Sequence, residues 1–349
     1  MNILIAAGGT GGHVFPALCV ANSLRDMGHH VICATDSRGN AYLSGFTGIK
    51  IIQNISYSTR TILYISLLIN TIKCIGKLLL NRPDCVVGFG GYPSIPFVLA
   101  AQLLFIRTVI HEQNAVIGKA NKILSFAADR MITSFPDVMP SSCDRKTVLI
   151  GNPTRFEKEY DAARPSGTDS FTILIFGGSQ GARLFAGVVS DAICKLAANM
   201  KLKIYHQVRT EDIDALRRKY KASGVDYVVS PFFENIGELY KLSVLGISRS
   251  GASSIFEIIG FRIPAILIPY KKSINGDQLA NARFLERHDA AVVIDEDDLT
   301  AEMLVNAIEQ LIEDPTRLQN ISQQLERLYV TDITTKCADA IIDNTTRYT

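Results

Sequence analysis

The sequence has no strong excess of either charge, since 36 lysine and arginine residues are balanced by 34 aspartate and glutamate residues and the net charge is +2. Proteins that bind nucleic acid through charge carry a strongly basic field, so we expect no nucleic-acid partner. The seven cysteines form no CxxC pair and no zinc-ligand spacing. We therefore expect no metal site, and reduced, mostly buried thiols as in cytosolic proteins.

The sequence also lacks a signal-peptide pattern and a long apolar run free of charge. Met1 and Asn2 lead directly into Ile3–Ala6 without a basic segment, which predicts a first strand instead of a leader. One apolar stretch, Ile62–Leu80, approaches the roughly 20 residues that a bilayer requires, but Lys73 and Lys77 interrupt it. The stretch predicts a helix that either lies in a membrane surface or crosses over a parallel sheet as a buried helix.

The length of 349 residues predicts two domains at about 150 residues each. Short apolar runs alternate with helical patterns, which is typical of parallel α/β sheets. Both halves open with a strand, a glycine-rich turn and a helix: ILIAAGGTGGHVFPAL and ILIFGGSQGARLFAGV. We expect two Rossmann-like, doubly wound domains on either side of a cleft, over 1–160 and 161–331, with a C-terminal helix within 332–349 packing back on the first.

The expected elements of both halves share this alternation. Strands are predicted over Ile3–Ala6, His30–Ala34, Asp84–Gly88, Thr108–His111, Arg130–Thr133, Thr147–Ile150, Thr172–Phe176, Lys203–Gln207, Asp226–Val229, Val244–Ile247, Ala265–Ile268 and Ala291–Ile294. Helices are predicted over Pro16–Met27, Ile62–Leu80, Ile95–Leu104, Gly118–Ala127, Arg183–Ala198, Ile213–Ala222, Ser253–Gly260, Gln278–Glu286, Thr300–Ile312 and Asp332–Ile342.

The first glycine-rich loop, Gly8–His13, combines close-approach backbone N–H groups with the positive end of a following helix. Such a loop suits a phosphate, although its spacing is neither GxGxxG nor a Walker loop. Imidazole titrates near neutrality, so His13 is either a general base or a loop and capping residue. The loops Gly88–Ser94 and Gly177–Ala182 repeat this pattern, and the first two together suit a diphosphate.

Acidic residues give weaker signals. Glu257 either accepts hydrogen bonds from a ribose diol or complements the dipole of its helix. His111 and Glu112 in HEQN form no HExxH motif but could act as an acid–base pair. The runs Asp212–Asp214 and Asp295–Asp297 could hold Mg²⁺ or Mn²⁺, although a helix dipole explains each of them.

Seven ordered motifs carry a resemblance that covers nearly the whole chain. They are GGTGGH, FGGYPS, HEQN, GNPTR, GGSQGA, SRSGASSIFE and DQLANA. The chain resembles the MurG family of bacterial peptidoglycan glycosyltransferases. This resemblance implies the GT-B fold and inverting transfer of N-acetylglucosamine from UDP-GlcNAc to the muramoyl 4-hydroxyl of undecaprenyl-diphospho-N-acetylmuramoyl-pentapeptide, which converts lipid I into lipid II without a cofactor.

The resemblance also assigns site residues. It implies His13 as the base and the following donor-binding residues: Thr10, Gly11, Gly12, Asn114, Arg155, Ser179, Gln180, Phe233, Ala252, Ser253, Ser254, Ile255, Phe256, Glu257 and Gln278. It implies that Gly90, Gly91, Tyr92 and Ser94 contact the acceptor diphosphate. Two positions depart from the family pattern, because Ile95 replaces a usual glycine and Phe233 a small aliphatic residue.

The lipid acceptor implies a peripheral protein on the cytoplasmic face of the bacterial inner membrane. Ile62–Leu80, with Lys73 and Lys77, would contact an anionic bilayer, and other cell-wall synthesis proteins are possible partners. The residues leave three other classes open: another GT-B enzyme, a dinucleotide-dependent oxidoreductase with Asp36 as its ribose acid, and a non-catalytic nucleotide-sugar binding protein. Donor and acceptor competition, NAD binding and turnover, respectively, distinguish them.

Overall fold

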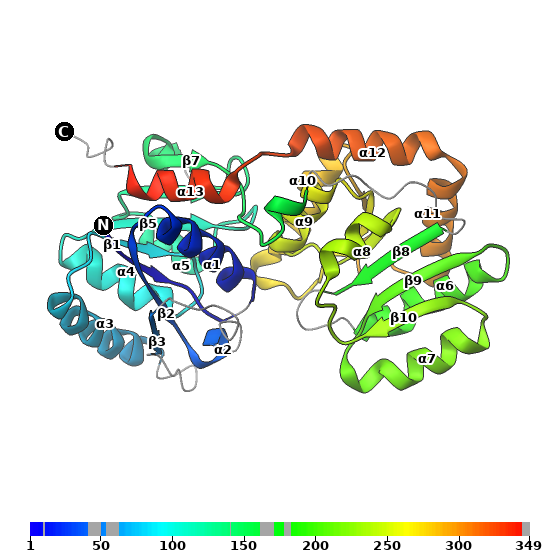
Figure 1. Ribbon diagram of the computed structural model, residues 1–349, viewed down its shortest axis with the longest axis horizontal. Helices are drawn as coiled ribbons and strands as arrows, with labels where there is room; N and C mark the ends of the chain where they lie inside the picture. Colours follow the sequence, from blue (N-terminus) through cyan, green and yellow to red (C-terminus); the bar gives the residue numbers. More distant parts are fainter. Residues whose placement is uncertain are drawn as a thin grey trace. The chain divides into compact units, whose positions relative to one another are not determined.

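The chain folds into two compact units in the computed structural model, which describes residues 1–9, 11–40, 50–53, 63–139, 141–160, 171–177 and 183–343 (Figure 1). Domain 1 comprises Met1–Glu157 and Val330–Thr349, and domain 2 comprises Lys158–Tyr329. The first domain boundary, expected after residue 160, lies after Glu157 in the structure. The chain returns to domain 1 at Val330.

Domain 1 is built on a parallel sheet with the strand order β3-β2-β1-β4-β5-β6-β7. Its strands are β1 (Asn2–Ala6), β2 (His30–Thr35), β3 (Lys50–Gln53), β4 (Cys85–Gly88), β5 (Arg107–Glu112), β6 (Arg130–Thr133) and β7 (Thr147–Leu149). Its helices are α1 (Gly11–Asp26), α2 (Ser37–Asn40), α3 (Leu63–Leu80), α4 (Ser94–Leu103), α5 (Lys119–Leu124) and α13 (Ile333–Ile342). All of β4 is buried, which explains its uninterrupted apolar sequence.

Domain 2 repeats the arrangement with the parallel order β10-β9-β8-β11-β12-β13. Its strands are β8 (Phe171–Phe176), β9 (Leu202–Gln207), β10 (Asp226–Ser230), β11 (Leu245–Ser248), β12 (Ala265–Leu267) and β13 (Val292–Val293). Its helices are α6 (Ser190–Ala197), α7 (Ile213–Ala222), α8 (Ile236–Leu242), α9 (Ala252–Phe261), α10 (Asp277–Arg287), α11 (Ala301–Glu313) and α12 (Pro315–Leu328).

Four of the helices and strands named above have no counterpart among the predictions: α2, β3, α8 and α12. The predicted helix over Arg183–Ala198 contains a π-helical segment at Phe185–Val189 before α6. The start expected at Pro16 was wrong, because α1 begins at Gly11 and keeps Pro16 inside the helix. Glycine is uncommon in the first turn of a helix and proline is common there, so the sequence pattern placed the start at Pro16 instead of at Gly11.

In each sheet the strand order reverses beside the first strand of the domain. β1 lies between β2 and β4, and β8 lies between β9 and β11. Open parallel sheets bind ligands at this switch point, beyond the carboxyl ends of the strands. The loops Gly8–His13 and Gly88–Ser94 follow β1 and β4, and the small-residue segment Arg249–Gly251 follows β11, so the topology places all three at a switch point. The third glycine-rich loop, Gly177–Ala182, lies outside the described residues after Gly177.

The C-terminal helix α13 packs against α1 within domain 1 (Figure 1). At its start, the backbone N–H and the hydroxyl of Thr334 donate to Glu157. At its end, Arg130 donates to the carbonyl oxygen of Ala340 over 2.8 Å, and Arg107 donates to that of Asp343 over 2.6 Å. A carboxylate at the N-terminus and two guanidinium groups at the C-terminus both complement the helix dipole.

Candidate active site

The first two glycine-rich loops of domain 1 pack against each other. A Cβ on Gly8 would lie 2.6 Å from Cγ of Pro93, and one on Gly91 would lie 2.4 Å from the carbonyl oxygen of Gly8. Gly91 also has a φ of +75°. Asp36 accepts from the N–H groups of Gly9 and Gly39 at 3.1 and 2.8 Å. The Asp36 carboxylate therefore stabilises this loop, and Thr10 of the same loop lies outside the described residues.

The second loop contains the four residues predicted to contact an acceptor diphosphate. Ser94 is buried, and its hydroxyl donates to the Gly91 carbonyl at 2.9 Å. Tyr92 is exposed. Ile95, the departure from the family pattern, is buried in the hydrophobic core of domain 1. Close packing leaves little room for a side chain at Gly90 or Gly91. Contact of this loop with a diphosphate stays a prediction.

His13 lies in the first turn of α1, and its ring is held by groups from two other segments. Its Nδ1 atom lies 3.2 Å from Oε1 of Gln113, which follows β5. The amide nitrogen of Gln113 donates to the Phe89 carbonyl at 2.7 Å, and Gln113 is buried. A Cβ on Gly90 would lie 3.1 Å from Nδ1 of His13. The structure thus brings His13, Gly90 and Gln113 together, and sequence reasoning missed Gln113.

The other members of HEQN support this loop. His111 contacts the Gly151 carbonyl through Nε2 at 3.1 Å and stacks on Phe89, and burial lowers its pKa to about 4. Glu112 accepts from the N–H of Asn114 at 3.1 Å and from Gly118 and Asn121 at 2.9 Å each. His111 and Glu112 therefore stabilise the neighbouring loops in this structure. Asn114 itself is partly exposed at the end of β5.

Arg155 reaches the start of α1 through an aromatic contact. Its guanidinium carbon lies 5.1 Å from the ring centre of Phe15 and 4.7 Å from that of Phe156. Phe15 is two residues beyond His13 in α1. The exposed side chain of Arg155 therefore places a cation next to the loop that holds His13.

In domain 2, α9 begins directly after Gly251 and carries the predicted nucleotide-contacting run. Ala252, Ile255 and Phe256 are buried, whereas Ser253, Ser254 and Glu257 are partly exposed. The hydroxyl of Tyr240 donates to Oε2 of Glu257 at 2.9 Å. Ser179 and Gln180, predicted at the donor phosphates, lie outside the described residues. Phe233 contacts the Tyr205 ring edge-on, with ring centres 6.4 Å apart.

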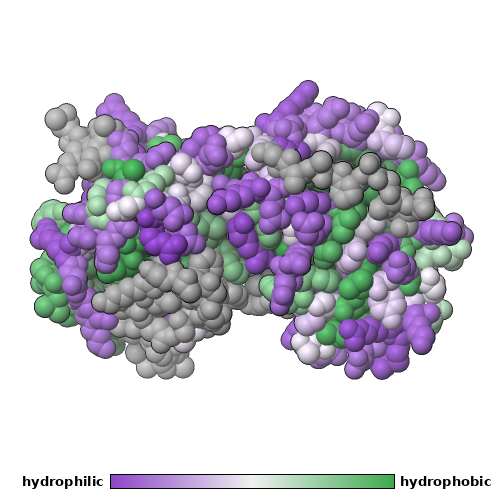
Figure 2. All heavy atoms as spheres, viewed as in Figure 1, coloured by the Kyte–Doolittle hydropathy of each residue, from purple (hydrophilic) through white to green (hydrophobic). Residues whose placement is uncertain are grey.

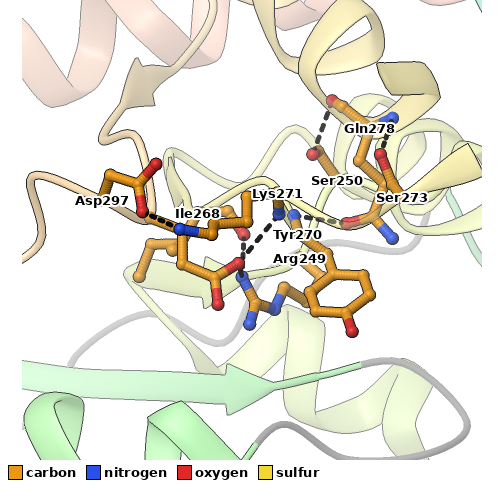
Figure 3. A network of polar contacts seen from close by, with 9 residues as sticks. Arg249, Ser250, Ile268, Tyr270, Lys271, Ser273, Gln278 and Asp297 are labelled. Atoms are coloured by element: carbon orange, nitrogen blue, oxygen red, sulfur yellow. Dashed lines mark hydrogen bonds and ion pairs between the residues drawn. The ribbon is translucent and has the colours of Figure 1, made fainter. Parts of the chain in front are cut away.

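Gln278 is fixed by the loop before α10 (Figure 3). Its Oε1 accepts from the N–H of Tyr270 at 3.0 Å, and its backbone carbonyl accepts from Ser250 at 2.7 Å. Since Oε1 is engaged by a backbone donor, the amide N–H groups of Gln278 are the groups suited to bind hydroxyls. Arg249 supports the same region by donating to the Ile268 carbonyl at 3.0 Å.

The acidic run after β13 is engaged by cations. Asp295 pairs with Arg283 at 2.9 Å, Glu296 pairs with Arg249 at 3.0 Å, and Asp297 pairs with Lys271. Glu296 also accepts from the N–H of Lys271 at 2.9 Å. Among the described residues, no group of three histidine, cysteine, aspartate or glutamate side chains could hold a metal ion. The Asp295–Asp297 run therefore has an ion-pairing role in this structure.

The two domains match the two halves of a known glycosyltransferase family. The glycosyltransferase family 28 N-terminal domain matches residues 3–133, and its C-terminal domain matches residues 172–336. The crystal structure of Acinetobacter baumannii MurG superimposes with a TM-score of 0.83 and 28% identity, covering 97% of this chain and 98% of that one. A glycosyltransferase of kitacinnamycin shares the fold at 17% identity and a TM-score of 0.70. The fold and these matches define a GT-B glycosyltransferase of family 28.

Curated relatives narrow this class. A UDP-N-acetylglucosamine–N-acetylmuramyl-(pentapeptide) pyrophosphoryl-undecaprenol N-acetylglucosamine transferase from Rhodospirillum rubrum is 38% identical over 98% of this chain and 91% of its own length. The transferase of the same name from Chelativorans sp. is 39% identical over 90% of this chain and 88% of its own. The chain belongs to this family of N-acetylglucosamine transferases, the MurG family.

Proposed function

We propose that this protein transfers N-acetylglucosamine from UDP-GlcNAc to the muramoyl 4-hydroxyl of undecaprenyl-diphospho-N-acetylmuramoyl-pentapeptide, the step from lipid I to lipid II in peptidoglycan synthesis. The observation that carries the proposal is the placement of His13. Its imidazole lies at the switch point of domain 1, on the first turn of α1, and Gln113 and Gly90 confine it. A basic side chain in such a place is suited to deprotonate a hydroxyl.

In the proposed reaction, His13 removes the proton of the muramoyl 4-hydroxyl while that oxygen attacks the anomeric carbon of N-acetylglucosamine. The bond between this carbon and the UDP oxygen breaks, so the α-configured donor gives a β-linked product. Negative charge then develops on the leaving diphosphate. Arg155, the third glycine-rich loop with Ser179 and Gln180, and the start of α9 supply the positive groups that stabilise it.

The rest of the donor is assigned to domain 2. Glu257 accepts hydrogen bonds from the ribose hydroxyls, and Ala252–Phe256 and Phe233 surround the nucleotide. Gln278 donates to hydroxyls of the transferred sugar, while Asn114 of domain 1 and the Thr10–Gly12 segment contact the sugar-diphosphate. The proposed reaction uses no metal ion.

The test is transfer of labelled N-acetylglucosamine from UDP-GlcNAc to a soluble short-chain lipid I analogue in the presence of EDTA. We expect product, and we expect His13→Gln to lower kcat by about 10² or more while changing donor binding little. A matched control is His288→Gln, because His288 is an exposed histidine of domain 2. No product with or without added Mg²⁺ would reject this donor–acceptor pair, and unchanged turnover in His13→Gln would reject His13 as the base.

The proposal includes peripheral attachment to the cytoplasmic leaflet through α3. No helix among the described residues is long and apolar enough to cross a membrane. One side of α3 is buried and carries Cys74 and Leu78. The other side exposes a row of large apolar residues: Ile65, Leu68, Ile69, Ile72, Leu79 and Leu80. The exposed side of α3 is therefore largely apolar. Figure 2 shows apolar surface at the margin of domain 1 near α3 and α4.

Basic groups accompany this apolar side of α3. Lys73 is exposed and Lys77 is partly exposed on the same helix. Apolar side chains entering the headgroup region, with lysines beside them, favour an anionic bilayer. Each lysine near such a surface contributes about 1 kcal/mol, so Lys73→Glu with Lys77→Glu should weaken vesicle binding roughly thirtyfold or more.

Vesicle cosedimentation tests this attachment directly. We expect binding to vesicles with phosphatidylglycerol and weaker binding to pure phosphatidylcholine. The control reverses the charge of two exposed lysines of domain 2, as Lys201→Glu with Lys221→Glu, and should leave vesicle binding unchanged. Equal binding by the α3 and control variants would contradict the attachment, while transfer to the soluble acceptor would report separately on catalysis.

A further inference from the structure

We infer that Gln113 is a positioning residue that fixes His13 in the tautomer with hydrogen on Nδ1 and thereby leaves Nε2 as the basic nitrogen. The inference deepens the proposed function, and it rests on that function for the role of His13 as base. It assigns a specific task to the buried glutamine of the HEQN motif, to which no role was assigned from the sequence. It also states which ring atom takes the acceptor proton.

The orientation of the Gln113 amide follows from its second partner. A backbone carbonyl can only accept hydrogen bonds, so the group of Gln113 that lies 2.7 Å from the Phe89 oxygen must be the NH₂ group. The oxygen Oε1 then points to His13 Nδ1, 3.2 Å away. Since this oxygen also only accepts, Nδ1 must carry the hydrogen. In the neutral ring the lone pair is then on Nε2.

The anchor of Gln113 is itself rigid. The N–H of Phe89 donates to the carbonyl of Ala6 at the end of β1 over 2.9 Å. The Phe89 ring is buried and stacks on His111, with ring centres 5.0 Å apart. The Phe89 carbonyl is thus fixed between β1 and β5, and the amide of Gln113 takes its direction from the sheet.

Gly90 lies against the imidazole beside its contact with Gln113. A Cβ at this position would lie 3.1 Å from Nδ1 and 3.2 Å from Cε1 of His13, and 3.6 Å from Oε1 of Gln113. The ring, the amide and the glycine are therefore in mutual contact. The second glycine-rich loop confines the base, and this role is independent of any contact that the loop makes with a diphosphate.

The tautomer can be observed without turnover. In protein labelled with ¹⁵N-histidine, two-bond ¹H–¹⁵N correlation spectra distinguish a protonated Nδ1 from a protonated Nε2, and loss of a signal in His13→Gln assigns His13. We expect hydrogen on Nδ1 in the neutral ring of the native protein. In Gln113→Leu, which is similar in size but cannot accept, we expect the Nε2–H tautomer or a mixture.

Steady-state kinetics of the Gln113 variants gives a second test. Gln113→Leu should lower kcat by about tenfold or more and change the KM for UDP-GlcNAc less than about threefold, because the base is misoriented while the donor groups are untouched. Gln113→Glu keeps an acceptor oxygen for Nδ1–H but loses the NH₂ donor to the Phe89 carbonyl. It should therefore favour the Nδ1–H tautomer and keep more activity than the leucine variant, but less than the native protein. Gln102→Leu is the matched control, since Gln102 of domain 1 also donates to a backbone carbonyl, that of Leu124, at 2.9 Å.

Two results would overturn the inference. One is hydrogen on Nε2 of neutral His13 in the native protein. The other is a Gln113→Leu variant with the native tautomer and the native kcat. The expected tautomer in a protein that transfers nothing from UDP-GlcNAc would instead support the positioning by Gln113 and reject the proposed function, so the two failures are distinguishable.

Discussion

Tyr240 on α8 donates its hydroxyl hydrogen to Oε2 of Glu257 on α9 over 2.9 Å. The tyrosine is fully buried, and its ring stacks on Phe261 with ring centres 4.8 Å apart and meets the Phe176 ring edge-on. The direction of this hydroxyl is therefore set by core packing. The buried tyrosine orients the carboxylate that we assign to the ribose.

Replacing Tyr240 by phenylalanine should weaken donor binding. The ring packing stays, while one hydrogen bond to a charged group is lost, which is worth about 1.5–3 kcal/mol in general. Only part of this loss acts on the donor, so we expect the KM for UDP-GlcNAc to rise about three- to tenfold with little change in kcat. Tyr227→Phe, a partly exposed tyrosine of the same domain, is the control, and equal KM values in both variants would contradict the role of Tyr240.

Gly90 and Gly28 allow a controlled test of the space around His13. Both have a positive φ, +85° at Gly90 and +86° at Gly28. A Cβ at Gly28 would meet nothing within 4 Å, whereas one at Gly90 would press on the His13 ring. Alanine at either site should cost about 1–2 kcal/mol in unfolding free energy.

Activity should separate the two glycine variants. Gly90→Ala is expected to lower kcat by about tenfold or more, because it displaces the base, and Gly28→Ala should retain the native kcat. Steady-state kinetics combined with thermal unfolding measures both effects. If Gly90→Ala and Gly28→Ala have the same kcat, the second loop does not confine the base.

The contact between Glu157 and Thr334 should stabilise domain 1. The carboxylate accepts from the N–H of Thr334 at 3.1 Å and from its hydroxyl at 2.6 Å, at the start of α13. Glu157→Ala leaves these donors unpaired, which should cost about 1–3 kcal/mol in unfolding free energy. Thermal unfolding measures the loss, with the exposed Glu302→Ala of domain 2 as control; an unchanged melting temperature would argue against this role.

The alternation of strands and helices predicted much of both sheets. The strand Arg130–Thr133 and the helix Ile213–Ala222 have the predicted bounds, and the all-parallel order follows from crossover helices between strands. Buried strands and amphipathic helices are local patterns, so a sequence displays them. The missed helix α12 has a polar average composition, with Ile321 and Leu325 as its buried residues.

The residues of the candidate site were harder to predict from the sequence than the fold. His13 and the glycine-rich loops have recognisable local patterns, but the partner of His13 is 100 residues away in the chain. Gln113 and Tyr240 act through the direction of one hydrogen bond, which depends on packing that no spacing rule contains. Two signals for Gln113 were present in the sequence: its place in the HEQN motif, and its position after the carboxyl end of a buried strand, where open parallel sheets bind ligands. Neither signal identifies His13 as its partner.

Two buried histidines should make the protein less stable in mild acid. Burial lowers the pKa of His111 to about 4 and, together with the charge of Lys219, lowers that of His206 to about 3, whereas both are near 6.5 in an unfolded chain. Between these values the unfolded state binds more protons, so stability falls as the pH falls from 6.5 towards 4. Each histidine contributes a slope of up to about 1.4 kcal/mol per pH unit.

Thermal unfolding between pH 7.5 and 4.5 measures this dependence for each domain. His206→Asn should unfold with a flatter pH dependence in domain 2, because its buried side chain no longer takes up a proton on unfolding. The control is His288→Asn in the same domain, where the histidine is exposed and the native slope should remain. If His206→Asn and His288→Asn keep the same slope, the acid sensitivity of domain 2 originates from its carboxylates, whose ion pairs weaken on protonation in the lower part of this range.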